Sequence, residues 1–188
     1  EVGCDVNRLN KDGETVLHME CRKLRQKSTQ VVELLLRNGA EVCGKNSLSL
    51  DPLTLTLIRA SEVSYLSTSS DWENVGDHNG KLAVEGKKVW VPILHSLLKA
   101  GAKWDNMWTS TSKSKSTQLH LLLTAFPPPV DQITQYRYLV ESALDAGFCN
   151  PMLEDGKGRN CVFVFCEAMG RVSFEIYPEC QRILASLL

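Results

Sequence analysis

The sequence lacks several features that would each point to a particular class of protein. It has no apolar run approaching the roughly 18–20 residues of a membrane helix, and it has no signal-peptide pattern. It contains no Asn-x-Ser/Thr glycosylation site, and its seven cysteines include no C-x-x-C pair. These absences argue against a secreted disulfide scaffold and against a zinc ribbon. We therefore expect an intracellular protein, cytoplasmic or nuclear, that does not associate with membranes.

A strong charge of one sign is also missing. The 21 Lys and Arg residues nearly balance the 22 Asp and Glu residues, so nucleic acid is not expected as a partner. The P-loop, GxGxxG, GxSxG and HExxH patterns do not occur either. We predict that the chain is not an enzyme and that it has no cofactor, no catalytic residue and no metal site.

What the sequence does contain is an internal repeat. An apolar helix ends in a glycine, a short polar segment that we call a finger follows, and a second apolar helix then begins behind a capping residue. The start of this second helix occurs four times, as TVLHME (15–20), DPLTLT (51–56), TQLHLL (117–122) and NCVFVF (160–165). Its buried anchors are predicted to be Leu17, Leu53, Leu119 and Val162.

Local chemistry explains each part of the pattern. Thr15, Asp51 and Thr117 occupy positions where a side chain can cap the first free amides of a helix, and a proline follows Asp51 at the first helical position. Glycines follow the preceding helices and can adopt the left-handed conformation that closes a helix, namely Gly39, Gly101 and Gly147. The Asp12-Gly13 pair suits a tight turn at a finger tip.

The four segments resemble the ankyrin repeat, whose signature includes T-P-L-H-x-A. TVLHME is the most similar, and the second and fourth segments lack the histidine. The resemblance implies an all-α fold, an ankyrin-repeat solenoid of helix-turn-helix units with finger turns. It also implies that His18 and His120 join neighbouring repeats by hydrogen bonds. One domain is expected over 1–188, with units at approximately 8–42, 43–104, 105–149 and 150–188.

The predicted anchors are 36, 66 and 43 residues apart, all more than the 33 of an ankyrin unit, which requires insertions. We predict a long loop over 60–88, within the second unit, because this stretch is rich in Ser, Gly, Asn and charge. A degraded repeat in the same stretch is the alternative. A stiff connector is predicted over 126–135, where three prolines follow one another; a PxxP ligand is the alternative there.

The resemblance implies that a partner protein or peptide binds the concave side, which the finger tips and the first helices form. Carried over position by position, the candidate contact residues are Lys11, Glu14, Arg22, Lys23, Arg59, Trp108, Lys113, Lys157 and Arg159. Because basic residues outnumber acidic ones in this set, an acidic or phosphorylated segment is the favoured partner. Trp104 is predicted to lie in the core and Trp108 in an enlarged third finger.

The main hypothesis is a non-catalytic protein interaction module. Two alternatives remain open at this point. The first is a histone-tail or modified-peptide reader, in which Trp108 and either Trp72 or Trp90 would cage a methylated lysine. The second is a regulatory or substrate-recruiting segment of a larger enzyme, which the abrupt start at EVGCDVN and stop at ILASLL suggest.

Overall fold

The chain folds into pairs of α-helices. The computed structural model describes residues 5–66, 78–105, 109–110, 115–147, 149–170, 172 and 174–188. Its helices are α1 (Val16–Lys23), α2 (Ser28–Arg37), α3 (Pro52–Leu66), α4 (His78–Lys99), α5 (Gln118–Thr124), α6 (Ile133–Asp145), α7 (Cys161–Met169) and α8 (Tyr177–Leu187). Short 3₁₀ turns span Val130–Gln132 and Phe174–Ile176. The expected all-α fold class is confirmed at this level, with one small hairpin of β1 (Thr109–Ser110) and β2 (Lys115–Ser116).

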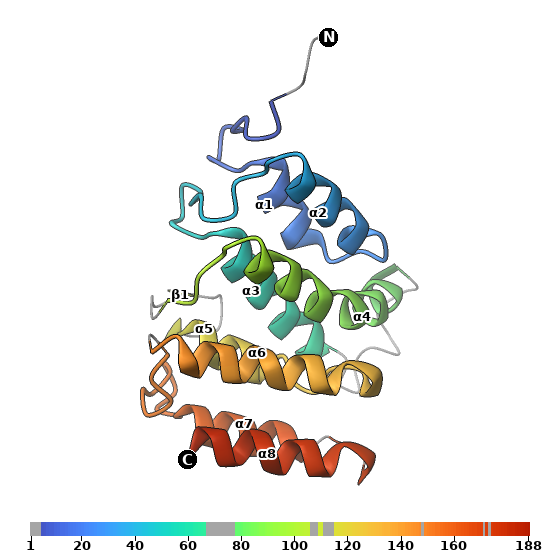
Figure 1. Cartoon of the computed structure of the whole chain (residues 1–188). Coiled ribbons are helices and arrows are strands. Elements are labelled where there is room, and N and C mark those ends of the chain that lie inside the picture. Colours follow the sequence, from blue (N-terminus) through green and yellow to red (C-terminus); the bar gives the residue numbers. More distant parts are fainter. Residues whose placement is uncertain are drawn as a thin grey trace.

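The helices form two layers. α1, α3, α5 and α7 contact one another in that order, and α2, α4, α6 and α8 do so beside them. Each odd-numbered helix also packs against the even-numbered helix that follows it in the chain. Figure 1 shows the resulting helix pairs stacked one after another from the N-terminal to the C-terminal end. We call each pair, with the finger before it, a unit. Within the described ranges, no helix combines the length and the apolar character needed to cross a bilayer.

Each odd-numbered helix begins behind a side chain that accepts a hydrogen bond from an amide three residues later. Thr15 accepts from the His18 amide, the Asp51 carboxylate accepts from the Thr54 amide at 2.7 Å, and Thr117 accepts from the His120 amide. The three predicted caps are therefore confirmed. Asn160 caps α7 in the same way, a role that the sequence analysis had not assigned. Each such cap stabilises a helix by about 1 kcal/mol.

The helix ends follow the prediction as well. Gly39, Gly101 and Gly147 have φ angles of 80°, 100° and 68°, a region that side chains with a Cβ rarely occupy. The amide after each of the first two glycines donates back to a carbonyl five residues earlier, at 3.0 Å in both cases. These bonds satisfy carbonyls that the helix end would leave open and turn the chain toward the next finger.

The core runs between the layers through all four units. The predicted anchors Leu17, Leu53 and Leu119 are fully buried, whereas Val162 in the last unit is half-buried. Aromatic rings contact one another between the later units. The ring centroids of Trp90 and Tyr136 are 5.8 Å apart and those of Phe126 and Phe165 are 5.1 Å apart, and both pairs are packed edge to face. Trp104 is buried, as predicted, and its indole N–H donates to Ser142.

The predicted loop over 60–88 is helical at both ends, because α3 continues to Leu66 and α4 begins at His78; residues 67–77 lie outside the described part. Two of the serines that suggested a loop, both within the described residues, have hydrogen-bond acceptors in the fold. Ser61 donates to the Ile58 carbonyl, and Ser64 donates to the Ala125 carbonyl in α5's unit. Ala60 and Val63 lie on one side of α3 and are both buried, so the helical spacing of buried residues continues into a stretch that is polar in composition.

The proline connector is also shorter than predicted. The chain turns helical again at Val130 and enters α6 at Ile133. Pro128 is buried and its two proline neighbours are half-buried, so the segment does not offer the exposed surface that a PxxP ligand requires.

Candidate interaction surface

The fingers repeat one turn in three units. An Asn or Asp stands five residues before the N-cap, at Asn10, Asn46 and Asp155. In each case one side-chain oxygen accepts hydrogen bonds from the amides two and four residues later, at 2.8 to 3.1 Å. This side chain holds the finger closed in the absence of a regular strand ladder. The sequence analysis had not identified this position, although the residue type at a fixed distance from the cap was visible.

Neighbouring fingers are joined to each other. The Ser47 amide and hydroxyl both donate to the Asp12 carbonyl, at 3.0 and 2.7 Å. Gly13, beside this contact, has a φ of 69°, and a Cβ there would approach the Ser47 hydroxyl to 3.0 Å. The predicted tight turn at Asp12-Gly13 is thus confirmed, and its glycine also permits the close approach of the second finger.

His18 and His120 tie successive units together, as the resemblance implied. In each imidazole, Nδ1 contacts the hydroxyl of the helix cap, Thr15 at 2.8 Å and Thr117 at 2.7 Å. Nδ1 of His18 also accepts from the Thr15 amide, which leaves the proton on Nε2. Nε2 lies 2.9 Å from the Gly44 carbonyl in His18 and 3.1 Å from the Arg159 carbonyl in His120. Burial lowers the pKa of His120 despite these contacts.

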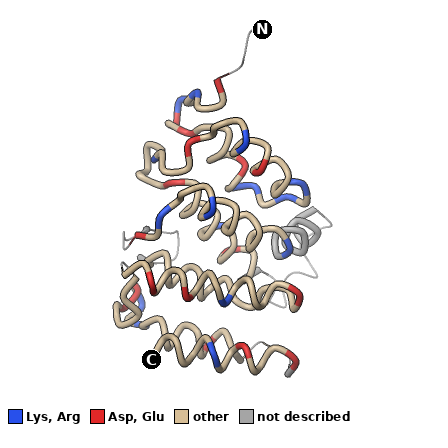
Figure 2. Tube along the Cα trace, in the orientation of Figure 1, with Lys and Arg blue, Asp and Glu red and all other residues tan. Residues whose placement is uncertain are grey.

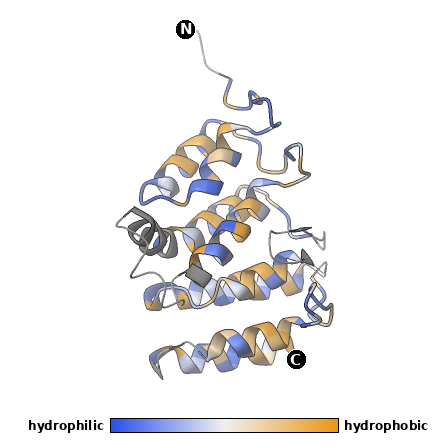
Figure 3. Cartoon of the chain, turned by 180° about the vertical axis from the view of Figure 1, so that it is seen from behind, coloured by the Kyte–Doolittle hydropathy of each residue, from blue (hydrophilic) through white to orange (hydrophobic). Residues whose placement is uncertain are grey.

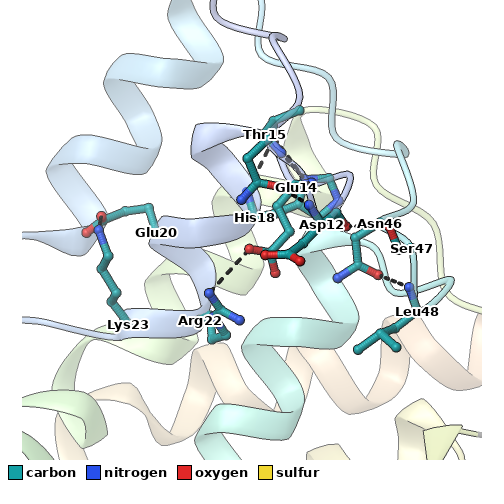
Figure 4. A network of polar contacts seen from close by, with 11 residues as sticks. Asp12, Glu14, Thr15, His18, Glu20, Arg22, Lys23, Asn46, Ser47 and Leu48 are labelled. Carbon is teal, nitrogen blue, oxygen red and sulfur yellow. Dashed lines mark hydrogen bonds and ion pairs between the residues drawn. The ribbon is translucent and has the colours of Figure 1, made fainter.

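An ion pair joins the finger of the first unit to helix α1. Arg22 on α1 donates to Glu14, the residue just before the N-cap, at 3.2 Å. Glu14 is only 4% exposed, whereas the Arg22 side chain is 59% exposed. Figure 4 shows this bond together with the cap and the finger contacts around it. The carboxylate is therefore part of the scaffold, and the guanidinium is the group that a partner can reach.

The last unit repeats this ion pair with the charges exchanged. Arg159 precedes the N-cap and donates to Glu167 on α7. Nε and Nη2 of Arg159 also both donate to Oδ2 of Asp155, at 3.0 and 2.8 Å. Burial acts to raise the pKa of Asp155, but the hydrogen bonds and charge of Arg159 outweigh it and the pKa is lowered. Burial acts to lower the pKa of Arg159, but its contacts with Asp155 and Glu167 outweigh burial, so this pKa is raised.

The two middle units carry uncharged residues at the same two positions, one before and seven after the N-cap. They are Leu50 and Ile58 in the second unit, both half-buried, and Ser116 and Thr124 in the third. We call these eight residues, one pair per unit, the inner-helix row. Its members are Glu14, Arg22, Leu50, Ile58, Ser116, Thr124, Arg159 and Glu167. The row has an apolar pair beside a hydroxyl pair in the middle, and a charged pair at either end.

The predicted contact residues do not form a purely basic surface. Lys23 and Arg59 contact Glu20 and Glu62, at 3.5 and 3.1 Å, in addition to the pairs of Arg22 and Arg159 described above. Lys11 and Lys157 are exposed on the fingers. Figure 2 shows positions of both charge signs interspersed along the stack. The predicted Trp108 and Lys113 lie outside the described residues.

One version of the aromatic cage is wrong. Trp90 is fully buried in α4 against Tyr136, so it cannot line a cage for a methylated lysine. Trp72 and Trp108 lie outside the described residues.

The buried cysteines do not add chemistry to this surface. Burial raises the pKa of Cys21 and Cys161 to about 12 and that of Cys149 to about 11, which keeps these thiols protonated and unreactive. Among the residues that the structure describes, no three His, Cys, Asp or Glu side chains are grouped closely enough to hold a metal ion.

Comparison with known proteins adds no family assignment. No protein-family model matches the sequence, and no curated protein matches it significantly. The ankyrin resemblance therefore remains a prediction based on the residues and the contacts given above.

Proposed function

We propose that the chain is a divergent ankyrin-repeat solenoid that serves as a protein interaction module and catalyses no reaction. Three recurrent features support this proposal. Each unit has a capped inner helix, each described finger closes on an Asn or Asp, and the histidines at matching positions bond to the next unit. Stacking of this kind produces an extended surface whose residues recur at fixed positions, and such surfaces bind other macromolecules.

The inner-helix row is the observation that carries this proposal. It places exposed Arg22 at one end, half-buried Leu50 and Ile58 next, and the Arg159–Glu167 pair at the other end. An extended peptide lying across the units would set an apolar side chain against Leu50 and Ile58 and an acidic one near Arg22. Since most cations here already contact acids, we expect apolar contact to supply most of the affinity and charge to steer the approach.

The described cysteines support the proposed compartment. Six of them are free thiols: Cys21, Cys43, Cys149, Cys161, Cys166 and Cys180. Cytosolic and nuclear proteins keep thiols reduced, so we place this module in the cytoplasm or the nucleus.

The test compares two surface variants in a quantitative capture experiment. The inner-helix variant carries Arg22→Gln, Leu50→Gln and Ile58→Gln, which remove the exposed cation and the apolar pair of the inner-helix row. The control is Arg37→Glu, because Arg37 is 77% exposed on the outer helix α2. Proteins captured by wild type and by the control, but lost from the triple variant, would support the proposed face.

The captured partner's affinity is then measured by titration with the three purified proteins. We expect the triple variant to bind at least about tenfold more weakly, which corresponds to about 1.4 kcal/mol. Equal binding by the triple variant, or selective loss in the Arg37→Glu control, would contradict a concave binding site.

A further inference from the structure

The two charged pairs of the inner-helix row expose opposite charges. In the first unit the cation is the accessible member, because the Arg22 side chain is 59% exposed and Glu14 only 4%. In the last unit the anion is the accessible member, because the Glu167 side chain is 47% exposed and that of Arg159 only 23%. The seventh residue after the N-cap therefore offers a positive charge at one end of the row and a negative charge at the other.

The exposure of Glu167 does not depend on where the stack ends. Arg22 has the same position in the first unit and stays exposed although α3 packs against α1. Side chains at this position therefore point away from the neighbouring unit. Glu167 would remain accessible in the same way beside a further unit.

The two middle units place uncharged groups between these charges. Leu50 and Ile58 are half-buried and apolar. The Thr124 hydroxyl donates to the His120 carbonyl at 2.7 Å, so its oxygen is left to accept a hydrogen bond from a partner. Figure 3 views the stack from behind, where the inner helices are nearer, and shows hydrophobic and hydrophilic positions on them. The row thus offers a cation, an apolar contact, a hydrogen-bond acceptor and an anion in successive units.

The spacing of the units selects one conformation of an extended partner. The inner helices contact one another in chain order, and helices packed side by side lie about 8–10 Å apart. A polyproline II helix has three residues per turn and advances about 9 Å in each turn. Every third side chain of such a segment would therefore meet the same position of the next unit. A β-strand does not fit equally well, because its side chains three residues apart point to opposite faces.

We propose that the inner-helix row binds a partner segment in the polyproline II conformation that carries four recognised side chains, one at every third residue. In the order from the first unit to the last they are acidic, apolar, hydrogen-bond-donating and basic. The acid meets Arg22, the apolar side chain meets Leu50 and Ile58, and the base meets Glu167. The opposite charges at the two ends fix the register of the segment. This inference rests on the proposed function and specifies its partner.

The probe is the peptide Asp-Pro-Pro-Leu-Pro-Pro-Ser-Pro-Pro-Lys, whose prolines hold it in the required conformation. It is made in both chain orders, because the four side chains define the alignment and not the backbone direction. The control for each order exchanges the Asp and the Lys, so that composition and conformation are unchanged. A control peptide either aligns its charges and sets leucine against Thr124, or aligns leucine and sets like charges together.

Calorimetric titration of the whole chain at low salt measures the four affinities. We expect the better-binding order of the probe to exceed both control peptides by at least about tenfold, since a control loses the apolar contact or gains two repulsions. Equal affinity of that probe and its control would overturn the proposal. So would the absence of binding by both orders of the probe.

Glu167→Gln tests the charged end of the row by itself. Arg159 keeps its contacts with Asp155 in this variant, so the fold should be retained, and thermal melting checks this. Binding of the probe should weaken about two- to fivefold, whereas a probe with Gln in place of Lys should bind both proteins equally. Glu33→Gln is the matched control, because the Glu33 side chain is 45% exposed on the outer helix α2. A loss of affinity in Glu33→Gln, or none in Glu167→Gln, would contradict the proposal.

The captured partner separates this inference from the proposed function. A partner that the inner-helix variant no longer binds, but whose binding segment lacks the three-residue spacing, would overturn the inference and leave the proposed function standing. A partner that carries the spaced side chains in its binding segment would support both.

Discussion

The first and last units of this chain have the same local design but different exposed ends. Both have a capped inner helix and an Asn or Asp that closes the finger. In the first unit, Leu17 and His18 are buried because a second unit covers them. At the same positions in the last unit, Val162 is half-buried and Phe163 is 57% exposed. A residue's position in the repeat thus determines which way its side chain faces, whereas the presence of a neighbouring unit determines whether that side chain is buried.

The two ends also differ in how they meet solvent. In the first unit, Glu20 contacts Ser28 and Lys23. In the last unit, the apolar side chains of Met152 and Phe163 are exposed. The two ends of the described stack thus differ in polarity.

The largest effect is expected from introducing a charge at the anchor position. Leu17→Asp would bury an unpaired carboxylate between two units and should cost roughly 4 kcal/mol or more, a large part of the stability of a domain. Val162→Asp, at the matching position of the uncovered unit, should cost about 1 kcal/mol. Urea unfolding followed by circular dichroism measures both. Equal losses of unfolding free energy in the two variants would contradict the idea that packing of a neighbouring unit sets the cost at the anchor position.

A smaller effect is expected at the position that His120 shares with Phe163. His120→Ala removes the contact to Thr117 and leaves the Arg159 carbonyl without this donor, which should cost about 2–3 kcal/mol. Phe163→Ala should change the stability of the dilute protein by less than about 0.5 kcal/mol. Chemical unfolding of the two variants and of the wild type gives both values. A Phe163→Ala loss as large as that of His120→Ala would mean that Phe163 belongs to the monomer core.

The smallest effect concerns pH at the same position. Burial lowers the pKa of His120 below its ordinary value of 6.5, so the unfolded chain takes up a proton at a higher pH than the folded chain does. Stability should therefore decrease as pH falls below about 6.5, and it should level off below the folded-state pKa. The check is a series of melting curves for wild type and His120→Gln. The variant should lose this part of the pH dependence, and an unchanged profile would exclude His120 as its source.

Several parts of the fold could be predicted because they depend on near neighbours in the chain. Thr15, Asp51 and Thr117 cap helices by accepting from amides three residues away. The helix-ending glycines are needed because the backbone at those positions has a positive φ angle. These interactions have the same geometry in any protein, so residue type and spacing were enough. Asn160 could have been included by the same rule.

Other features could not be predicted because they depend on distant segments. Ser64 was predicted to lie in a loop, but it is part of α3 and its hydroxyl donates to the Ala125 carbonyl, 61 residues away in the sequence. Trp90 was a candidate for an exposed cage, but α6 places Tyr136 against it. By contrast, the ion pairs of Arg59 with Glu62 and of Arg159 with Asp155 join residues three and four apart, so the sequence alone could have indicated that these cations have partners.

By itself the sequence determined where the inner helices begin, three of their caps, the closing glycines and the repeat of one pattern four times, since these depend on bonds within a few residues. The tertiary structure alone decided which side of each inner helix is covered and how deeply each position is buried. Burial arises between units that are far apart in the chain, so the environment of a position depends on whether a neighbouring unit packs against it. Val162 illustrates the difference, because it stands at the anchor position of the repeat but is only half-buried in the fold.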